Sequence, residues 1–180
     1  MDDTALDCKA AVSVKRMRSA DLPLAAEIHR LAFVRQTRSE EWLRSNLNAE
    51  PKTLCYAAFY GAHCVGYIIW SQKAGYRPEV VLELEQIAVR PDHQGKSIGK
   101  ALITQSLPEV ARSLEAQGST LKHILVTTRA DNHAQQLYRS LLGAEVEATI
   151  SGLYSADEVI MVARNVPQSL ICPNGATAVR

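Results

Sequence analysis

Apolar and polar residues repeat along this chain with two different periods, and the two periods predict alternating strands and helices. Two-residue alternation and short apolar runs predict strands at residues 12–17, 54–60, 64–70, 80–89, 122–128, 146–150 and 158–163. Helical spacing of apolar residues predicts helices at residues 21–34, 39–48, 97–115 and 131–142. The resulting order, β-αα-β-β-β-α-β-α-β-β, is typical of an α+β domain with an α/β-like mixed sheet.

The first two long strands are predicted to form a hairpin around Gly61–Ala62. Glycine at the first turn position favours a type II′ turn. With that turn, Cys64 faces Phe59 and Cys55 faces Ile68, so the two cysteines are not cross-strand neighbours. A disulfide between them is therefore not expected.

Several residues predict where the helices begin and end. Asp21 and Ser39 are expected to cap the first two helices, and Gly143 is expected to end the last one. Pro108 lies inside the third helix and is expected to kink or split it.

Length and composition indicate one ordinary globular domain. The chain has 180 residues, of which 47% are hydrophobic and 22% charged, and its net charge of +1 gives no general attraction for nucleic acid or membrane. We expect an N-terminal arm at 1–11, one domain at 12–164 and a tail at 165–180 that is irregular or docked on a partner. No signal peptide or membrane span is expected, so we place the protein in the cytoplasm.

Cysteine and histidine usage adds little chemistry. The four cysteines are scattered without a C-x-x-C pair, which favours reduced thiols. The five histidines show no metal-ligand spacing, so no metal is expected.

The segment that follows the strand at 80–89 has the arrangement of an anion site. Pro91 marks a turn, a glycine-bearing loop covers 94–99, and a helix starts directly afterwards. Loop amides and the positive end of a helix dipole favour a phosphate at such a place. Gly95 and Gly99 carry no Cβ, so a pyrophosphate can approach the backbone closely.

Two common nucleotide-binding motifs do not fit this loop. The nucleoside-triphosphate loop needs a glycine where Arg90 stands, and the dinucleotide fingerprint needs a different glycine spacing. The segment instead resembles the acetyl-CoA loop of the Gcn5-related N-acetyltransferase (GNAT) superfamily. The matching positions are Val89, Pro91, Gln94, Gly95, Ser97, Ile98, Gly99 and Leu102. Ser97 stands where glycine is most frequent, which matters if that position needs a positive φ.

A second segment also resembles this superfamily. The matching positions are Asn132, Ala134, Leu137–Tyr138 and Gly143–Ala144, with Ala144 in place of the usual aromatic residue. The resemblance covers about residues 12–163. It implies a GNAT fold, in which about four helices flank a mixed sheet of about seven strands that is splayed in the middle.

The resemblance implies a set of residues that bind acetyl-CoA. The pantetheine would bond to the strand backbone, the loop would hold the pyrophosphate between two lysines, and an asparagine would hold the pantetheine arm or cap its helix. These residues are Ile87, Ala88, Val89, Gln94, Gly95, Lys96, Ser97, Ile98, Gly99, Lys100 and Asn132.

The resemblance also implies the catalytic groups. Tyr138 would protonate the leaving thiolate, although a core tyrosine fits the same apolar stripe. Glu85 aligns with a glutamate that some members use as a base through water. Glu83 and Glu85 share a face of a regular strand, and an ordinary exposed face is the alternative. Thr127 holds the place of another family base and cannot serve as one.

These features predict an acetyl-CoA-dependent N-acetyltransferase that works by direct attack in a ternary complex. A small-molecule primary amine is favoured over a protein or peptide amine, and a homodimer is a candidate assembly. A non-catalytic acyl-CoA-binding or sensing domain is the alternative. The aromatic residues Trp42, Tyr56, Tyr67 and Trp70 suit an acceptor pocket, but such spacing more often marks core.

Overall fold

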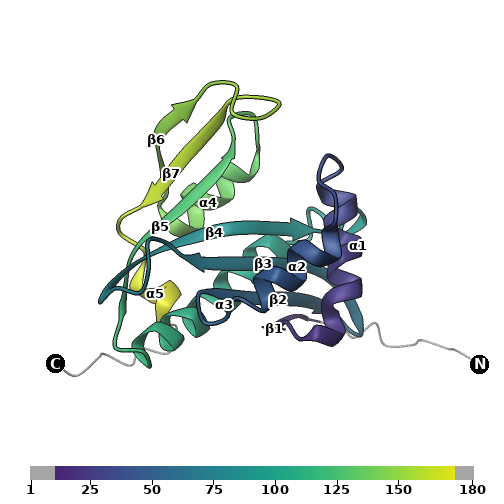
Figure 1. Cartoon of the computed structure of the whole chain (residues 1–180), viewed down its shortest axis with the longest axis horizontal. Coiled ribbons are helices and arrows are strands. Elements are labelled where there is room, and N and C mark those ends of the chain that lie inside the picture. Colours follow the sequence, from purple (N-terminus) through teal and green to yellow (C-terminus); the bar gives the residue numbers. More distant parts are fainter. Residues whose placement is uncertain (1–10, 173–180) are drawn as a thin grey trace, which may run out of the picture.

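A seven-stranded mixed sheet organises the molecule (Figure 1). The computed structural model describes residues 11–172, and the strand order across the sheet is β1-β2-β3-β4-β5-β7-β6. The strands are β1 (Val12–Arg16), β2 (Thr53–Tyr60), β3 (His63–Gln72), β4 (Glu79–Val89), β5 (Thr120–Arg129), β6 (Glu145–Ile150) and β7 (Glu158–Ala163). The predicted strands are thus all confirmed, with ends that differ by a few residues.

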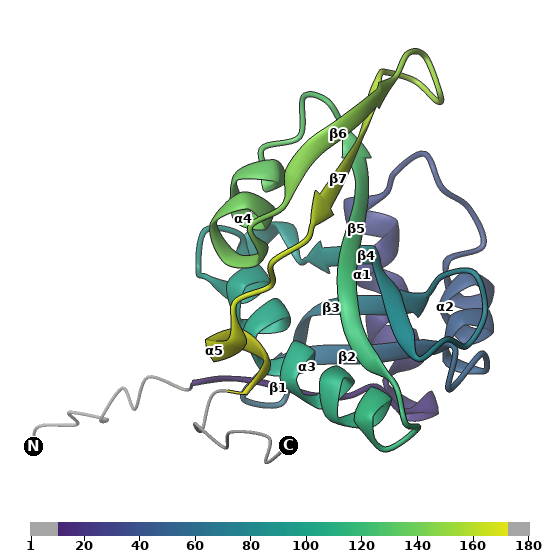
Figure 2. The same cartoon turned by 90° about the vertical axis from the view of Figure 1, so that its left-hand side faces the viewer.

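Helices pack on both faces of this sheet (Figure 2). The helices are α1 (Leu22–Ala32), α2 (Ser39–Leu47), α3 (Ile98–Glu115), α4 (Ala134–Leu142) and α5 (Gln168–Ile171), with short 3-10 turns η1 (Ser19–Asp21) and η2 (Pro91–His93). Helices α1 and α2 lie on one face, and α3 and α4 lie on the other. None of the helices within residues 11–172 combines the length and apolar character needed to cross a bilayer.

Each face of the sheet has its own core. The larger core lies between the sheet and α3 and α4, with Trp70, Leu102 and Tyr138 among its buried members. The smaller core lies under α1 and α2, and includes Ile28 and Tyr67. Alternating side chains of β3 supply both cores, which explains why this strand is almost continuously apolar.

The sheet opens in the middle, between β4 and β5. These two strands pair in parallel only from Glu79 to Glu83 of β4, against Thr120 to Leu125 of β5. Beyond this point the strands part, and the edge of β4 from residue 84 onward has no strand beside it. The predicted splay is confirmed.

A β-bulge in β4 lies at the same point. Gln86 pairs with Ile69 and Leu84 pairs with Trp70, so Glu85 is an extra residue without a partner in β3. A bulge bends its strand and re-aims side chains. Leu84 joins the larger core, whereas Gln86 points to the α1–α2 side.

The hairpin prediction is confirmed with one correction. Gly61 has φ +60°, and β2 and β3 are joined by the two-residue turn. Cys64 does face Phe59, but Cys55 faces Ile69 rather than Ile68, because the register shifts between Ala58 and Phe59. Cys55 and Cys64 are free thiols, as expected.

The cap predictions had mixed outcomes. Gly143 ends α4 with φ +68° as expected. Ser39 does not cap α2, because its buried hydroxyl bonds the ring of His29 instead. The Asp21 carboxylate accepts the backbone N–H of Arg18 and so closes η1 rather than capping α1. Pro108 does not split α3, which runs unbroken from Ile98 to Glu115.

The tail is less irregular than expected over its first part. Residues 168–171 form α5, which packs against α3, and Leu170 and Val166 contact the larger core. Two apolar side chains are enough to dock this single turn. The rest of the expected tail and residues 1–10 of the expected arm, with Cys8, lie outside the described residues.

Candidate active site

The loop before α3 presents a series of unpaired backbone amides. Within residues 11–172, none of the N–H groups from Gly95 to Lys100 donates to a protein acceptor, and the first helical bond is Ala101 N–H to Ser97 O at 3.0 Å. These amides gather at the positive end of an 18-residue helix. The arrangement is therefore suited to a phosphate or pyrophosphate.

The backbone conformation of this loop depends on two residues in the left-handed region. Gly95 has φ +77° and Ser97 has φ +59°. Glycine adopts this conformation freely, but for serine it costs about 1–2 kcal/mol. The position of Ser97 thus does need a positive φ, and the serine is accommodated with strain. Lys96 and Lys100 are both exposed here, and Lys96 Nζ donates to the Asp92 carbonyl at 3.1 Å.

The open edge of β4 offers main-chain groups next to this loop. Arg90 donates its N–H to Val65 at 2.9 Å, so Ala88 and Arg90 direct their main-chain groups to β3. By alternation, the N–H and C=O groups of Ile87 and Val89 face the open side. The geometry therefore favours Ile87 and Val89, and not Ala88, as main-chain partners of a ligand. The Gln94 side chain donates to the Val89 carbonyl at 3.4 Å.

Two carboxylates lie beside the opening, on the face of the sheet that carries α1 and α2. Glu83 forms an ion pair with Lys73 and accepts a hydrogen bond from Thr127 of β5 at 3.5 Å. Burial, and then the charge of nearby Glu83, raise the pKa of Glu85 above its ordinary value. Glu85 is thus a stronger base than a free carboxylate, as a proton acceptor near neutral pH should be.

Tyr138 of α4 belongs to the larger core, on the opposite face of the sheet. Its side chain is 3% exposed, and its hydroxyl has no hydrogen-bond partner within residues 11–172. Burial raises the pKa of Tyr138 to about 12, so the phenol stays protonated at neutral pH. A buried tyrosine normally has a partner for its hydroxyl, so the unpaired phenol makes Tyr138 a candidate proton donor.

Asn132 ties α4 to the end of β5. Its side-chain oxygen accepts the Ala134 N–H at 2.9 Å, and its amide donates to Thr128 at 2.8 Å. Asn132 thus satisfies the N–H of the first helical residue, but the N-cap position itself is His133, which forms no side-chain cap bond. A contact with pantetheine stays a prediction.

A buried polar network next to Glu85 escaped the sequence analysis. Gln86 Oε1 accepts from Tyr67 at 2.8 Å and from Trp42 at 3.1 Å, and Gln86 Nε2 donates to Gln36 at 3.3 Å. His29, which is fully buried, lies within 2.9 Å of Gln36. Burial lowers the pKa of His29, which keeps its ring neutral.

This network holds the α1–α2 loop against the bulged strand. Its members are far apart in sequence, and no local motif announces them. Of the four aromatic residues considered for an acceptor pocket, Tyr56, Tyr67 and Trp70 are buried in the cores. Trp42 is 38% exposed and belongs to the network.

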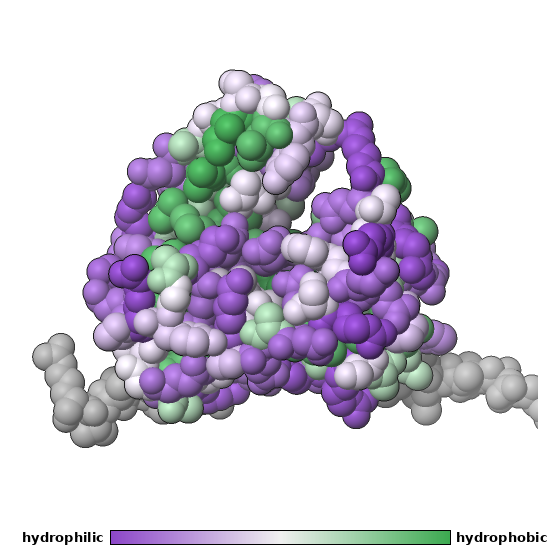
Figure 3. Space-filling view, viewed as in Figure 1, coloured by the Kyte–Doolittle hydropathy of each residue, from purple (hydrophilic) through white to green (hydrophobic). Residues whose placement is uncertain are grey.

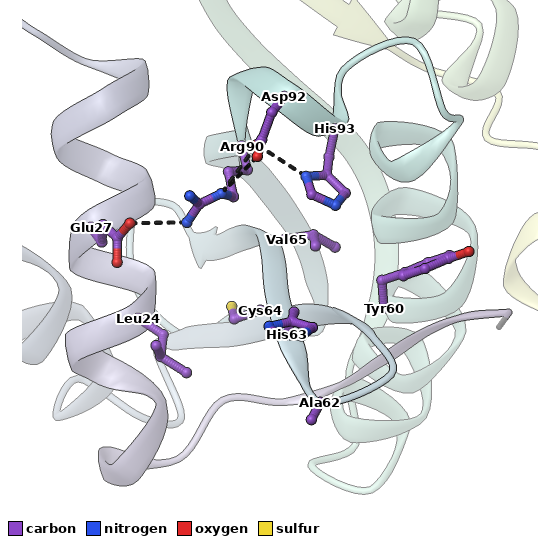
Figure 4. Close-up of a pocket in the computed structure, with 10 residues that line it drawn as sticks. All are labelled: Leu24, Glu27, Tyr60, Ala62, His63, Cys64, Val65, Arg90, Asp92 and His93. Carbon is purple, nitrogen blue, oxygen red and sulfur yellow. Dashed lines mark hydrogen bonds and ion pairs between the residues drawn. The ribbon is translucent and has the colours of Figure 1, made fainter.

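A separate pocket lies at the start of the loop and not at the opening (Figure 4). It has a volume of about 460 Å³ and is lined from α1, the β2–β3 turn and η2. Arg90 crosses it, bonded to Glu27 at 2.9 Å and to Asp92 at 3.1 Å. Neither Glu85 nor Tyr138 lines this pocket, so we do not take the pocket as the candidate active site.

Other candidate chemistries find little support among residues 11–172. No group of three or more histidine, cysteine, aspartate or glutamate side chains in this part is placed to hold a metal ion. Burial raises the pKa of Cys55 to about 12 and that of Cys64 to about 11, so both thiols are protonated and poor nucleophiles at neutral pH.

Comparison with known protein families shows to which family this chain belongs. A sequence model described as the Acetyltransferase (GNAT) family matches residues 22–144, which contain the loop, the open strand and Tyr138. The chain belongs to the GNAT family. A search of curated protein sequences found no match.

Solved GNAT structures share the fold at low sequence identity. The ribosomal-protein-S18-alanine N-acetyltransferase of Escherichia coli is 20% identical, with a TM-score of 0.69 over 94% of this chain and 100% of that one. An aminoglycoside 6'-N-acetyltransferase complexed with coenzyme A is 15% identical, with a TM-score of 0.68 over 86% and 98%.

A third similar structure is Arabidopsis thaliana NAA60 in complex with a bisubstrate analogue. It is 14% identical, with a TM-score of 0.68 over 84% of this chain and 97% of that one. These neighbours include enzymes named for small-molecule and for protein acceptors, so the GNAT fold by itself does not select the acceptor.

Proposed function

We propose that this GNAT protein is an acetyl-CoA-dependent N-acetyltransferase that transfers the acetyl group directly to a primary amine in a ternary complex. The observation that carries the proposal is the series of unpaired amides from Gly95 to Lys100, directly beside the open edge of β4. A pyrophosphate at the amides and the amide-bearing pantetheine along the edge together match acetyl-CoA. Ile87 and Val89 supply the main-chain partners.

The residues at the opening suit both proton transfers. The amine nitrogen attacks the thioester carbon, the C–N bond forms, and the C–S bond breaks with its electron pair left on sulfur. Glu85, directly or through water, takes the proton from the amine, because its raised pKa makes it a competent base. Tyr138 donates its phenolic proton to the thiolate. A main-chain N–H on the open edge polarises the thioester carbonyl.

Direct transfer is favoured over an acetyl-cysteine intermediate. The buried thiols of Cys55 and Cys64 stay protonated, and Cys172 lies on the surface near α5. A small acceptor is favoured over a folded protein. Arg35 of the α1–α2 loop bonds Ser155 of the β6–β7 loop, so these two loops are joined, and we expect the joined loops to favour a small acceptor.

The first test is calorimetric titration with acetyl-CoA, followed by release of free thiol in the presence of a panel of amines. We expect a Kd of about 10 μM or tighter, which corresponds to about −7 kcal/mol. Gly99→Glu should abolish binding by repulsion of the phosphates. Gly99→Ala is its matched control, because a Cβ here meets only the end of Leu137 at 3.3 Å.

Three results would separate the alternatives. Thiol release that depends on both substrates supports the enzyme. Tight binding without turnover for any amine would favour the non-catalytic acyl-CoA-binding domain. Retained binding in Gly99→Glu would remove the loop as the pyrophosphate site.

A further inference from the structure

An apolar surface lies on the β5–β7–β6 part of the sheet, on the face that carries α1 and α2. Val159, Met161 and Ala163 of β7 point the other way, into the core with α4. The residues that alternate with them form what we call the open sheet face. Its apolar members are Leu125, Ala148, Ile150, Ile160 and Val162, and the register places Thr127, Arg129, Glu145 and Glu158 on the same face.

Strand register makes this surface continuous. Ile160 pairs with Thr127 on one side and with Ala148 on the other, and Val162 pairs with Leu125. Cross-strand partners share a face of the sheet. Figure 3 shows the result as a green patch over β5, β6 and β7, surrounded by polar surface. Ile150, at its outer end, is 37% exposed.

The open sheet face meets the two carboxylates at its inner end. Glu83 is in register with Leu125, and Thr127 donates to Glu83 at 3.5 Å. Glu85 follows two residues later, at the bulge. Two cations lie near this pair of carboxylates: Lys73 forms an ion pair with Glu83, and the charges of Lys73 and Lys52 both act on Glu85.

The outer rim of the opening is also partly apolar. Val34 in the α1–α2 loop is 81% exposed, and Tyr154 in the β6–β7 loop is 78% exposed. The bond between Arg35 and Ser155 joins these two loops. In Figure 3 an opening through the molecule lies beside the green patch, between the β6–β7 hairpin and the α1 side.

We propose that the acceptor is an amphiphilic primary amine, with one ammonium group bound at Glu83 and Glu85 and an apolar chain or ring laid over the open sheet face. This inference rests on the proposed function and names its substrate class. The two carboxylates can accept an ammonium group, and burial of an apolar tail removes the patch from water. A polyhydroxylated amine would leave the patch exposed, and a diamine would lose the apolar contact of its far end.

A matched set of amines tests the substrate class. Hexylamine and 5-amino-1-pentanol have the same length and one ammonium each, and differ at the far end. We expect kcat/KM to be about tenfold higher for hexylamine, and to rise about 2–4-fold for each CH₂ added from butylamine to octylamine. 1,5-Diaminopentane should be a poorer acceptor than hexylamine.

A pair of substitutions on one hairpin tests the surface. Val162→Thr keeps the side-chain shape and places a hydroxyl on the open sheet face. Val146→Thr makes the same change on β6, where Val146 faces the opposite side beside Met161. We expect Val162→Thr to lower the hexylamine to aminopentanol preference several-fold, mainly through KM, and Val146→Thr to leave it unchanged.

The outcomes separate this inference from the proposed function. Faster transfer to aminopentanol than to hexylamine, or no dependence on chain length, would overturn the amphiphilic acceptor while the acetyltransferase stands. The protein could instead prove to be a dimer that Val162→Thr converts to a monomer without changing the amine preference. That result would assign the open sheet face to contact with a second copy and overturn the inference. Acetyl-CoA binding without thiol release for any amine would overturn both.

Discussion

The β1–β4 part of the sheet and the β5–β7 part differ in how their faces are covered. Almost every residue of β2 and β3 is buried, because α1 and α2 cover one face and α3 covers the other. Every residue of β6 is exposed, and β7 alternates buried and half-buried side chains from Val159 to Ala163. The first part is thus a doubly covered scaffold, and the second is a half-covered surface.

The site lies where these two parts separate. For the proposed reaction, the scaffold would supply the loop amides, the open edge of β4 and Glu85. The half-covered part would supply Tyr138 from its buried face and the open sheet face from its exposed one. If the proposed function holds, one sheet carries the cofactor on the doubly covered side of the opening and leaves surface for an acceptor on the other.

Tyr138→Phe tests the chemical contribution of the half-covered part and should have the largest effect. Loss of the proton donor should lower kcat about 10²–10⁴-fold. Acetyl-CoA affinity should stay within a few-fold. The melting temperature should hardly change, because the hydroxyl has no partner within residues 11–172. Tyr76→Phe, at a position 65% exposed, is the control, and an unchanged kcat in Tyr138→Phe would remove it as the acid.

Glu85→Gln tests the scaffold side of the opening. We expect kcat to fall about 10²-fold and the acidic limb of the pH–rate profile to disappear. The pKa of Glu85 is raised in the folded protein, so its ionisation opposes folding. This penalty is absent below the unfolded pKa and complete above the folded one.

The same variant therefore has a second, opposite readout. Glu85→Gln should raise the melting temperature at pH 7 and leave it unchanged at about pH 3, well below the ordinary glutamate pKa. A lower melting temperature at pH 7 would show that the ionised carboxylate is stabilised and not strained. If the acidic limb of the pH–rate profile persists in Glu85→Gln, the base is Glu83 or water and not Glu85.

Gly66→Ala tests the close packing of the scaffold without touching the chemistry. A Cβ at this position would lie 2.8 Å from the Ala88 carbonyl oxygen and 3.1 Å from Leu102 Cδ1. We expect a loss of about 1–3 kcal/mol in the free energy of unfolding. The melting temperature should fall by about 2–4 °C for each kcal/mol. Gly99→Ala should lower the free energy of unfolding by less. Equal losses in the two variants would contradict the idea that packing around Gly66 of β3 is tighter than packing around Gly99.

Ser97→Gly should have the smallest effect and tests the junction between strand and loop. Relief of the strain at φ +59° is offset by the greater backbone freedom of glycine in the unfolded chain. We expect stability to change by less than about 1 kcal/mol, and acetyl-CoA affinity to change only a few-fold. A gain of tenfold or more in affinity by calorimetry would show that the serine disables the loop.

The contrast between the two parts also explains which sequence predictions succeeded. Strands, the Gly61 turn and the Gly143 helix end follow from local periodicity and local backbone preference, and the structure confirms them. Ser39 has the sequence signature of a cap, but the ring of His29 competes for its hydroxyl. Ala88 was grouped with its neighbours, because only strand pairing reveals which main-chain groups remain open.

Local patterns in the amino-acid sequence therefore determined the order of elements, the glycine-bearing loop before α3 and the family of this protein. Tertiary structure decided where β4 and β5 part, which residue bulges and how Gln86 holds the α1–α2 loop. It also placed Glu83 beside Leu125 and formed the open sheet face from three strands. The physical reason is that helix, turn and strand preferences act over a few residues, whereas register and burial depend on segments up to about a hundred residues apart.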